Sequence, residues 1–196
     1  CCVFYVGHRG AGALMRLVDI CAGMPTVIYG LWGLTVVVPL INHLVPPGTS
    51  MLAGVVVLSM MIFPTITVMT HSAISAVPKS CLYASAGLGV RTSSTIIHVI
   101  LRRARPGILA AMTLGAARAI GETIVVLMVC GNVVQMPHSV FDPIRALTAN
   151  IALEMDYARG IHQSALYATG FVVMMVVALL VLVSEICSRS IERETR

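Results

Sequence analysis

Residues 107–130 read GILAAMTLGAARAIGETIVVLMVC, and this stretch decides the fold. A helix that spans a membrane needs about 20 consecutive apolar residues, and this segment is long and apolar enough to be one. Arg118 and Glu122 nevertheless lie near its middle. An ionised side chain at that depth costs about 3 kcal/mol or more, so each of the two charges is expected to have a specific role.

On a helical wheel, the charged residues of this segment share a face with its small residues. This face holds Ala111, Gly115, Arg118, Ala119 and Glu122. The opposite face holds Leu109, Ile120, Ile124 and Leu127. Because small residues let helices approach closely, we expect the first face to look into a helical bundle and the second into lipid.

Arg118 and Glu122 are four residues apart, a spacing that brings side chains together on a helix. Two interpretations follow from the helix alone. The two residues form a self-neutralised pair that only fixes helix packing, or they line a substrate pathway.

The composition is that of an integral membrane protein. Hydrophobic residues make up 58% of the 196, charged residues only 11%, and the mean hydropathy is +0.93. The apolar residues form long runs and do not alternate, which favours helices over a barrel. We therefore expect an all-α, polytopic membrane helical bundle.

The apolar runs predict about four spans within a single domain over residues 1–196. They cover about 17–45, 51–70, 107–130 and 164–187. Prolines and glycines interrupt the first run, which is expected to cross with a kink or a break, and Pro-Pro-Gly at 46–48 is expected to form a turn. The chain opens abruptly on CCVFYV, so we expect a further N-terminal portion upstream.

The distribution of positive charge predicts the orientation. Residues 71–106 carry five Lys or Arg and no acidic residue. Together with the start of the chain and the tail, they hold ten of the thirteen Lys and Arg, whereas 131–163 holds two. By the positive-inside rule, 71–106 and the tail are cytoplasmic and 131–163 is external.

An enzyme is a poor fit to this sequence. The six cysteines form no CxxC and no metal-ligand pattern. An intramembrane enzyme with Glu122 or a histidine as general base would need a second catalytic group at similar depth, but Asp19 and Glu185 lie near cytoplasmic ends. The chain also contains no HExxH, GxSxG or GxxxxGK[ST] motif.

Four passages resemble the permease subunits of bacterial ABC importers, specifically those of the phosphate uptake system. They are MPTVIYGLWGL (24–34), LYASAGLGVR (82–91), RPGILA to LMVCGN (105–132) and FDPIRALTANIALEM (141–155). The second lies where these permeases carry a cytoplasmic ATPase-docking motif, Glu-Ala-Ala followed by Gly. The last two passages are the most specific.

The resemblance implies a multi-pass permease of the inner membrane that forms half of a phosphate pathway. Its expected partners are a related permease subunit, two ATP-binding subunits and an external phosphate-binding protein, with no role for nucleic acid. The chain would hold no cofactor, because ATP is bound by the partner ATPase. Arg118 would offer the anion a cation, and Glu122 would neutralise it when the path is empty. Phosphonate, molybdate or sulfate are alternative cargoes.

The docking motif departs from the family's pattern. Ala84 and Gly89 match, and Gly89 would allow a sharp turn between two short helices. Tyr83 replaces the glutamate, Ser85 replaces an alanine, and Arg102 replaces a proline further on. The alternative interpretation of 71–106 is a basic segment that only anchors the topology.

Overall fold

The computed structural model describes residues 8–194 and the side chains of 12–188, and this part of the chain is built from helices. In chain order they are α2 His8–Ala22, α3 Thr26–Trp32, η1 Gly33–Val37, α4 Val38–Asn42, α5 Met51–Ser75, α6 Lys79–Gly87, α7 Thr92–Ser94, η2 Thr95–Ile100, α8 Leu101–Gly121, α9 Ile124–Val129, α10 Leu147–Glu154 and α11 Ile161–Glu194. Segments η1 and η2 are π-helical. Among the described residues, extended pairing is limited to one bridge between Gly131 and Ile144. The predicted all-α class is confirmed.

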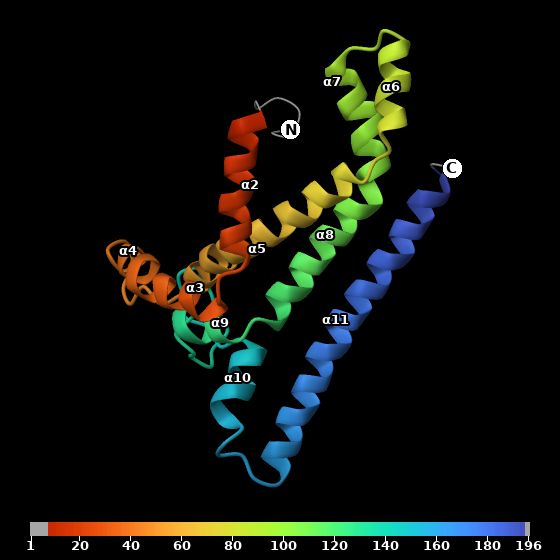
Figure 1. Ribbon diagram of the computed structural model, residues 1–196. Helices are drawn as coiled ribbons and strands as arrows, with labels where there is room; N and C mark the ends of the chain where they lie inside the picture. Colours follow the sequence, from red (N-terminus) through yellow and green to blue (C-terminus); the bar gives the residue numbers. More distant parts are fainter. Residues whose placement is uncertain (1–7, 195–196) are drawn as a thin grey trace.

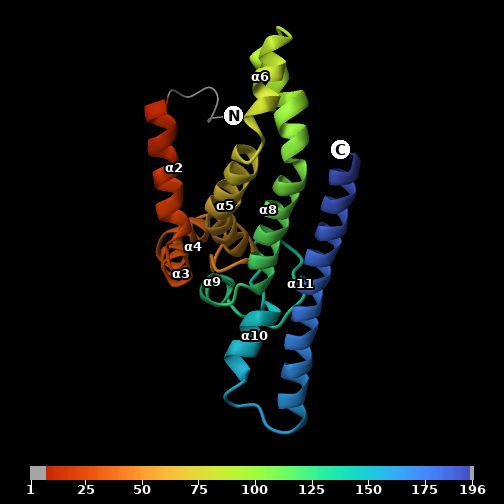
Figure 2. The same ribbon diagram turned by 45° about the vertical axis from the view of Figure 1, so that its right-hand side comes forward.

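The frame of the molecule is a layer of three long helices, in which α8 packs against α5 on one side and α11 on the other (Figures 1 and 2). Two helices of the described chain are long and apolar enough to cross a membrane, α5 and residues 161–188 of α11. These helices cover the residues of the spans predicted at 51–70 and 164–187, and both extend further. Helix α8 does not meet that test, because four arginines lie among its 21 residues.

The span predicted at 17–45 is two helices that meet at a sharp corner. Residues 12–22 and 26–42 are apolar enough to count together, but they are bent by 93° at the break between them. The Tyr29 hydroxyl donates a 2.7 Å hydrogen bond to the Cys21 carbonyl across this corner. This contact satisfies a carbonyl at the end of α2 that has no partner within the helix.

The small-residue face of α8 is buried against α5, as predicted for Ala111 and Gly115. A Cβ atom built on Gly115 would lie 2.6 Å from the side chain of Ile66. The two helices therefore lie close together here, and a larger residue at Gly115 would require the Ile66 side chain to move.

The hydrophobic core is centred on the short helix α9. Val125 and Val129 are fully buried there, and Val57 of α5 is fully buried in the same cluster. The second half of the 107–130 stretch therefore forms the core of the fold. Leu127, which was predicted to lie on the lipid-facing side, packs against this core. Ile124, from the same predicted face, is exposed.

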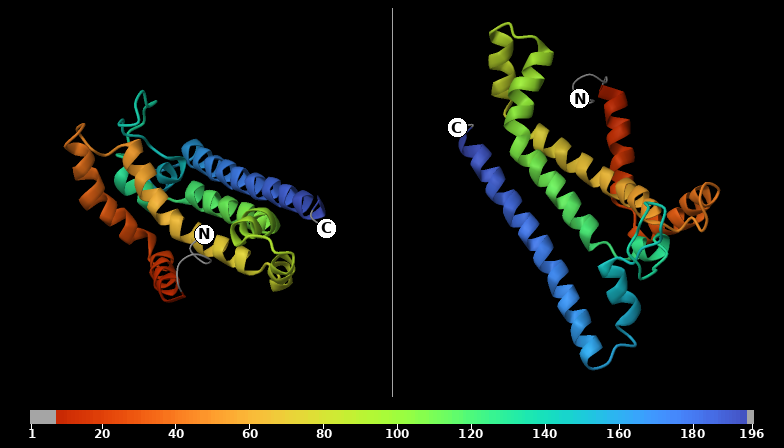
Figure 3. Two further views of the ribbon diagram at one scale, coloured as in Figure 1. Left: turned by 90° about the horizontal axis from the view of Figure 1, so that it is seen from above. Right: turned by 180° about the vertical axis from the view of Figure 1, so that it is seen from behind.

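The elements segregate to two ends of the molecule. The beginning of α2, the α6–α7 hairpin and the end of α11 lie at one end, and α10 with the turn into α11 lies at the other (Figures 1 and 3). The three basic parts of the sequence are thus brought to the same end, as the charge count predicts for the cytoplasmic side.

Candidate functional site

The stretch 107–130 is broken in the middle, and the prediction that it forms one continuous helix is wrong. Helix α8 ends at Gly121, Glu122 has an extended backbone with ψ of 128°, and α9 begins at Ile124. Proline plays no part in this break. The Glu122 side chain stabilises it by supplying the next helix with a hydrogen-bond acceptor.

Glu122 caps the start of α9. Its Oε1 accepts hydrogen bonds from the backbone N–H of Ile124 at 3.1 Å and of Val125 at 3.3 Å. The first amides of a helix have no partners within the helix, and a carboxylate is well suited to them because the helix N-terminus is partly positive.

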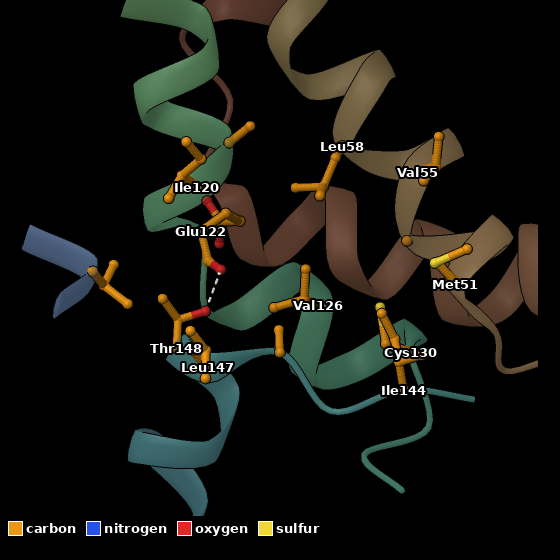
Figure 4. A pocket seen from close by; sticks show the side chains of 14 residues that line it. Met51, Val55, Leu58, Ile120, Glu122, Val126, Cys130, Ile144, Leu147 and Thr148 are labelled. Atoms are coloured by element: carbon orange, nitrogen blue, oxygen red, sulfur yellow. Dashed lines mark hydrogen bonds between the residues drawn. The ribbon is translucent and has the colours of Figure 1, made fainter. Parts of the chain in front are cut away.

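The break is also tied to the end of the molecule at which α10 lies. The Thr148 hydroxyl, in the first turn of α10, donates a 2.9 Å hydrogen bond to the Glu122 carbonyl (Figure 4). This carbonyl has no helical partner because the chain leaves α8 there. Glu122 therefore joins α8, α9 and α10 through both its side chain and its backbone.

Arg118 and Glu122 do not pair. No salt bridge joins them in the described chain, because the break rotates Glu122 off the α8 face on which the helical wheel places it beside Arg118. Arg118 is exposed, whereas its small neighbours Ala111 and Gly115 are buried. Its guanidinium lies within electrostatic range of the Tyr29 phenol. The expected inward-facing location of Arg118 within this chain is therefore also wrong.

Glu122 instead borders a pocket of about 300 Å³, shown in Figure 4. The lining is otherwise mainly apolar and comes from α5, α8, α9, α10, α11 and the 144–146 segment: Met51, Gly54, Val55, Leu58, Ala119, Ile120, Val126, Cys130, Ile144, Ala146, Leu147, Thr148 and Val173. Arg118 is not part of this lining. The two residues predicted to share a site therefore face different surroundings.

We call residues 131–163 the external segment, after the location that the charge count predicts for it. A polar network holds this segment together, and the sequence gives no signal for its pairing. Arg145 forms an ion pair with Glu154 and donates to Asn150 at 3.1 Å, and its Nε donates to the Asn132 carbonyl at 3.0 Å. Nε2 of His162 lies 2.8 Å from the other Glu154 oxygen. The network joins the loop after α9 to α10 and to the start of α11.

A tight turn in the same external segment caps α5. Asp142 Oδ2 accepts hydrogen bonds from the amides of His138 at 2.8 Å and Ser139 at 2.9 Å, and these bonds hold the pKa of Asp142 below its usual range. The carbonyls of Val140 and Asp142 accept from the first amides of α5, at 2.8 and 2.9 Å. The turn thus supplies partners that α5 lacks.

At the other end, α6 and α7 form the hairpin predicted for the docking motif. Gly89 turns the chain with φ of +69°, as expected for its position between two short helices. Ala84 and Tyr83 are exposed on α6, whereas Ser85 is 7% exposed and donates to the Cys81 carbonyl at 2.8 Å. Three residues depart from the motif of the family. Ser85 is buried within the hairpin, whereas Tyr83 on α6 and Arg102 on α8 are exposed.

Comparison with known families identifies the class of protein to which this fold belongs. Residues 3–196 match the family described as the binding-protein-dependent transport system inner membrane component. The chain belongs to this family of ABC transporter permeases.

Several curated relatives are similar over most of the chain. A probable ABC transporter permease protein of Bacillus subtilis, YqgH, is 38% identical over 177 residues, covering 88% of this chain and 57% of the relative. The phosphate transport system permease protein PstC of Haemophilus influenzae is 29% identical and covers 86% and 60%. PstC 1 of Mycobacterium tuberculosis is 28% identical and covers 94% and 61%. The chain therefore spans about three-fifths of the length of these relatives.

Solved structures confirm the fold. An inward-facing structure of the MetNI methionine ABC transporter matches with a TM-score of 0.73 over 96% of this chain and 78% of that chain, at 18% identity. A second crystal form gives a TM-score of 0.67 at 20% identity, covering 94% of this chain and 75% of that chain.

Proposed function

We propose that this chain is a permease subunit of an ATP-driven importer for inorganic phosphate. The observation that carries the proposal is the position of Arg118. It is the one Lys or Arg between residues 106 and 144, and its side chain is exposed on the surface of the chain. A cation at this depth is costly against lipid, so that surface is expected to face a second subunit or a watery path.

The chemistry of arginine suits this cargo. The guanidinium is planar and always charged, and it donates two parallel hydrogen bonds to phosphate oxygens. The amides of α9 hold the Glu122 carboxylate, so it does not pair with Arg118. An anion can therefore contact Arg118 without first displacing a carboxylate of the same chain. In this proposal Glu122 keeps the break in place beside the path, and Arg118 contacts the cargo.

The remaining parts of the importer are supplied by partners. A related permease subunit provides the other half of the path, two ATP-binding subunits bind and hydrolyse ATP, and an external binding protein delivers phosphate. The hairpin containing Ala84 and Gly89 docks on an ATP-binding subunit. The phosphate assignment draws support from the relatives named phosphate permeases, at 28–29% identity.

Uptake with competing anions tests the assignment. The chain is co-expressed with its proposed permease, ATP-binding and binding-protein partners in cells that lack their own phosphate importers. We expect ATP-dependent uptake of radiolabelled phosphate that excess sulfate, molybdate or phosphonate leaves unchanged. Uptake of one of those anions in place of phosphate would reassign the cargo, and the absence of uptake of any of them would contradict an oxyanion importer.

A further inference from the structure

Two arginines at the start of α8 lie side by side on its exposed face. Arg102 and Arg105 are both exposed and are three residues apart, so their side chains leave the helix about 60° from each other and within one turn. Ala104 and Ala111 are buried and mark the inward side of the helix. Arg103 is also exposed, but helical spacing places it about 100° from Arg102 and about 160° from Arg105. Arg102 and Arg105 therefore share one surface, and Arg103 lies on another.

An exposed apolar side chain continues this surface toward the middle of α8. Met112 follows Arg105 by seven residues, which is close to two helical turns, and it therefore lies on the same face, about 20° away. It is 55% exposed. The surface thus presents two cations and, about 10 Å further along the helix, an apolar side chain. A phospholipid presents its charged headgroup and its apolar chains in the same order.

The end of the apolar span of α5 indicates the depth of Arg105. Helix α5 runs antiparallel to α8 (Figure 1), and a Cβ atom built on Gly107 would lie 2.6 Å from the Cβ atom of Ala73. The span of α5 ends at Ser75, two residues beyond Ala73, which is about level with Arg105 on α8. By this measure, Arg105 lies at the boundary between the hydrocarbon layer and the lipid headgroups.

The apolar span of α11 indicates a similar depth. The Thr113 hydroxyl donates a 2.7 Å hydrogen bond to the Ser184 hydroxyl between α8 and α11. The span of α11 ends at Ser188, about one turn beyond this contact, and α11 is also antiparallel to α8 (Figure 1). Together, the two spans place Arg105 within about 6 Å of the hydrocarbon boundary and Arg102 about 5 Å further out. This depth matches the headgroup layer of a bilayer.

The described part of the chain supplies these two arginines with no counter-charge. The salt bridges between described side chains involve Arg145 and His162, which lie on the external segment. Residues 71–106 contain no Asp or Glu. An anion that comes from outside the chain would therefore meet no competing carboxylate among the residues beside it.

From this placement we propose that Arg102 and Arg105 bind the phosphate of an anionic phospholipid, with an acyl chain lying along the face that Met112 continues. Guanidinium groups donate parallel pairs of hydrogen bonds to phosphate oxygens. Two neighbouring cations favour a lipid with a net negative charge over a zwitterionic lipid, whose ammonium group they repel. The site is separate from Arg118 and does not depend on the cargo of the importer.

The depth of this surface favours a lipid over the ATP-binding subunit. In Figures 1 and 2 the α6–α7 hairpin projects beyond the end of α11, whereas α8 begins at the base of the hairpin and packs between the long apolar helices. A partner in water reaches the tip of the hairpin first. Arg102 and Arg105 lie at the level where the apolar helices end, and headgroup phosphates gather at that level.

Lipid binding by the purified chain tests the proposal. Native mass spectrometry in a neutral detergent counts the bound lipids and gives the affinity of the strongest site. We expect the unmodified chain to bind phosphatidylglycerol about tenfold or more tightly than phosphatidylcholine. The double variant Arg102→Gln, Arg105→Gln is expected to lose this preference. If the double variant does not fold, the two single variants replace it, and each is expected to weaken phosphatidylglycerol binding about threefold or more.

Arg103 supplies a matched control on the same helix. Arg103→Gln removes the same charge from the neighbouring position but from a different face, so it is expected to keep the affinity for phosphatidylglycerol within about twofold. An equal loss in Arg103→Gln and in the double variant would mean that lipid responds only to the total charge. That result would overturn a site formed by Arg102 and Arg105.

Anions without acyl chains distinguish a lipid from free phosphate. Inorganic phosphate and glycerol phosphate carry the same group as the lipid, and in large excess neither is expected to displace phosphatidylglycerol, because neither covers the apolar part of the surface. Displacement by either would overturn the lipid site and assign the arginine pair to a soluble phosphate.

Two further results would overturn the proposal. The first is equal binding of phosphatidylglycerol and phosphatidylcholine by the unmodified chain. The second is a double variant that keeps its affinity for phosphatidylglycerol but no longer binds the ATP-binding subunit, which would assign the two arginines to a protein interface. Phosphate uptake takes no part in these measurements, so their failure leaves the proposed function to its own test.

Discussion

The Thr148 hydroxyl donates a hydrogen bond to the Glu122 carbonyl, and this contact joins the external helix α10 to the break between α8 and α9. The same break receives its second support from the Glu122 side chain, which caps α9. Glu122, which follows Arg118 by four residues, thus links the end of α8 to both α9 and α10.

The Thr148 bond predicts a measurable loss of stability. Thr148→Val keeps the shape of the side chain but leaves the Glu122 carbonyl without its donor, so we expect a loss of about 1–2 kcal/mol. Thr148→Ser retains the hydroxyl and serves as the control. Thermal unfolding of the purified chain in detergent compares the two, and equal midpoints for Val and Ser would show that the bond contributes nothing.

The capping role of Glu122 predicts an order among its variants. Glu122→Gln retains an oxygen that can accept from Ile124 and Val125, so assembly and uptake are expected to stay near normal. Glu122→Ala removes the acceptor and is expected to destabilise α9 by about 1 kcal/mol. Unfolding midpoints and membrane yield measure the difference. A Gln variant as defective as Ala would mean that the charge is required and the cap is not.

The break at Glu122 is a feature of the candidate site that hydropathy did not predict. Hydropathy predicted α5 and α11 correctly because length and apolar content are sufficient for an uninterrupted helix. The stretch 107–130 has the same average character, and its break depends on a single side chain turning back to two amides. A signal was present, since Gly121 is typical of a helix end and Thr123 of a helix start, but the apolar run masked it.

Gly89 predicts a backbone effect without steric overlap. Its φ is +69°, and a Cβ atom added to it would meet no other atom within 4 Å. Any cost of Gly89→Val is therefore conformational, and we expect it to distort the hairpin and weaken association with the ATP-binding subunit while membrane insertion is kept. Gly87→Ala is the matched control, because Gly87 has equal space and helical geometry. Unchanged association and uptake in Gly89→Val would contradict a docking role for this turn.

The Asp142 turn predicts a dependence on pH. Because the pKa of Asp142 is lower in the folded chain than its ordinary value of about 3.9, its stabilising effect is fully present above that value and is lost as the pH falls through the lower, folded pKa. Asp142→Asn removes the effect at neutral pH. Hydrogen exchange at the amides of Met51 and Leu52, which the turn caps, is expected to be faster in the variant at pH 7, with a difference that shrinks in acid.

An exposed acid nearby supplies the control for that experiment. Asp156 lies in the same external segment and is exposed, so Asp156→Asn is expected to leave exchange at Met51 and Leu52 unchanged. Equal exchange in the Asp142 and Asp156 variants would contradict the capping role of the turn.

The pairing of Arg145, Glu154 and His162 is a second feature that could not be predicted from the sequence. Arg145 and Glu154 are nine residues apart, and His162 follows eight residues later, a spacing that fits no single helix face. Only the path of the chain from the loop through α10 into α11 brings them together. The positions of basic residues along the sequence, in contrast, predicted which end of the bundle the hairpin and the tail share, since that rule needs no tertiary contact.

The central claim is that Arg118 contacts phosphate through its planar fork, and the most direct test is the initial rate of radiolabelled phosphate uptake by Arg118→Lys, normalised to the amount of assembled complex. Lysine keeps the charge but cannot donate two parallel hydrogen bonds from one plane. We predict an assembled complex that binds its ATP-binding subunit and carries phosphate at less than about a tenth of the normal rate. Normal uptake by Arg118→Lys would contradict the claim, and normal uptake by Arg118→Gln as well would place Arg118 outside the path.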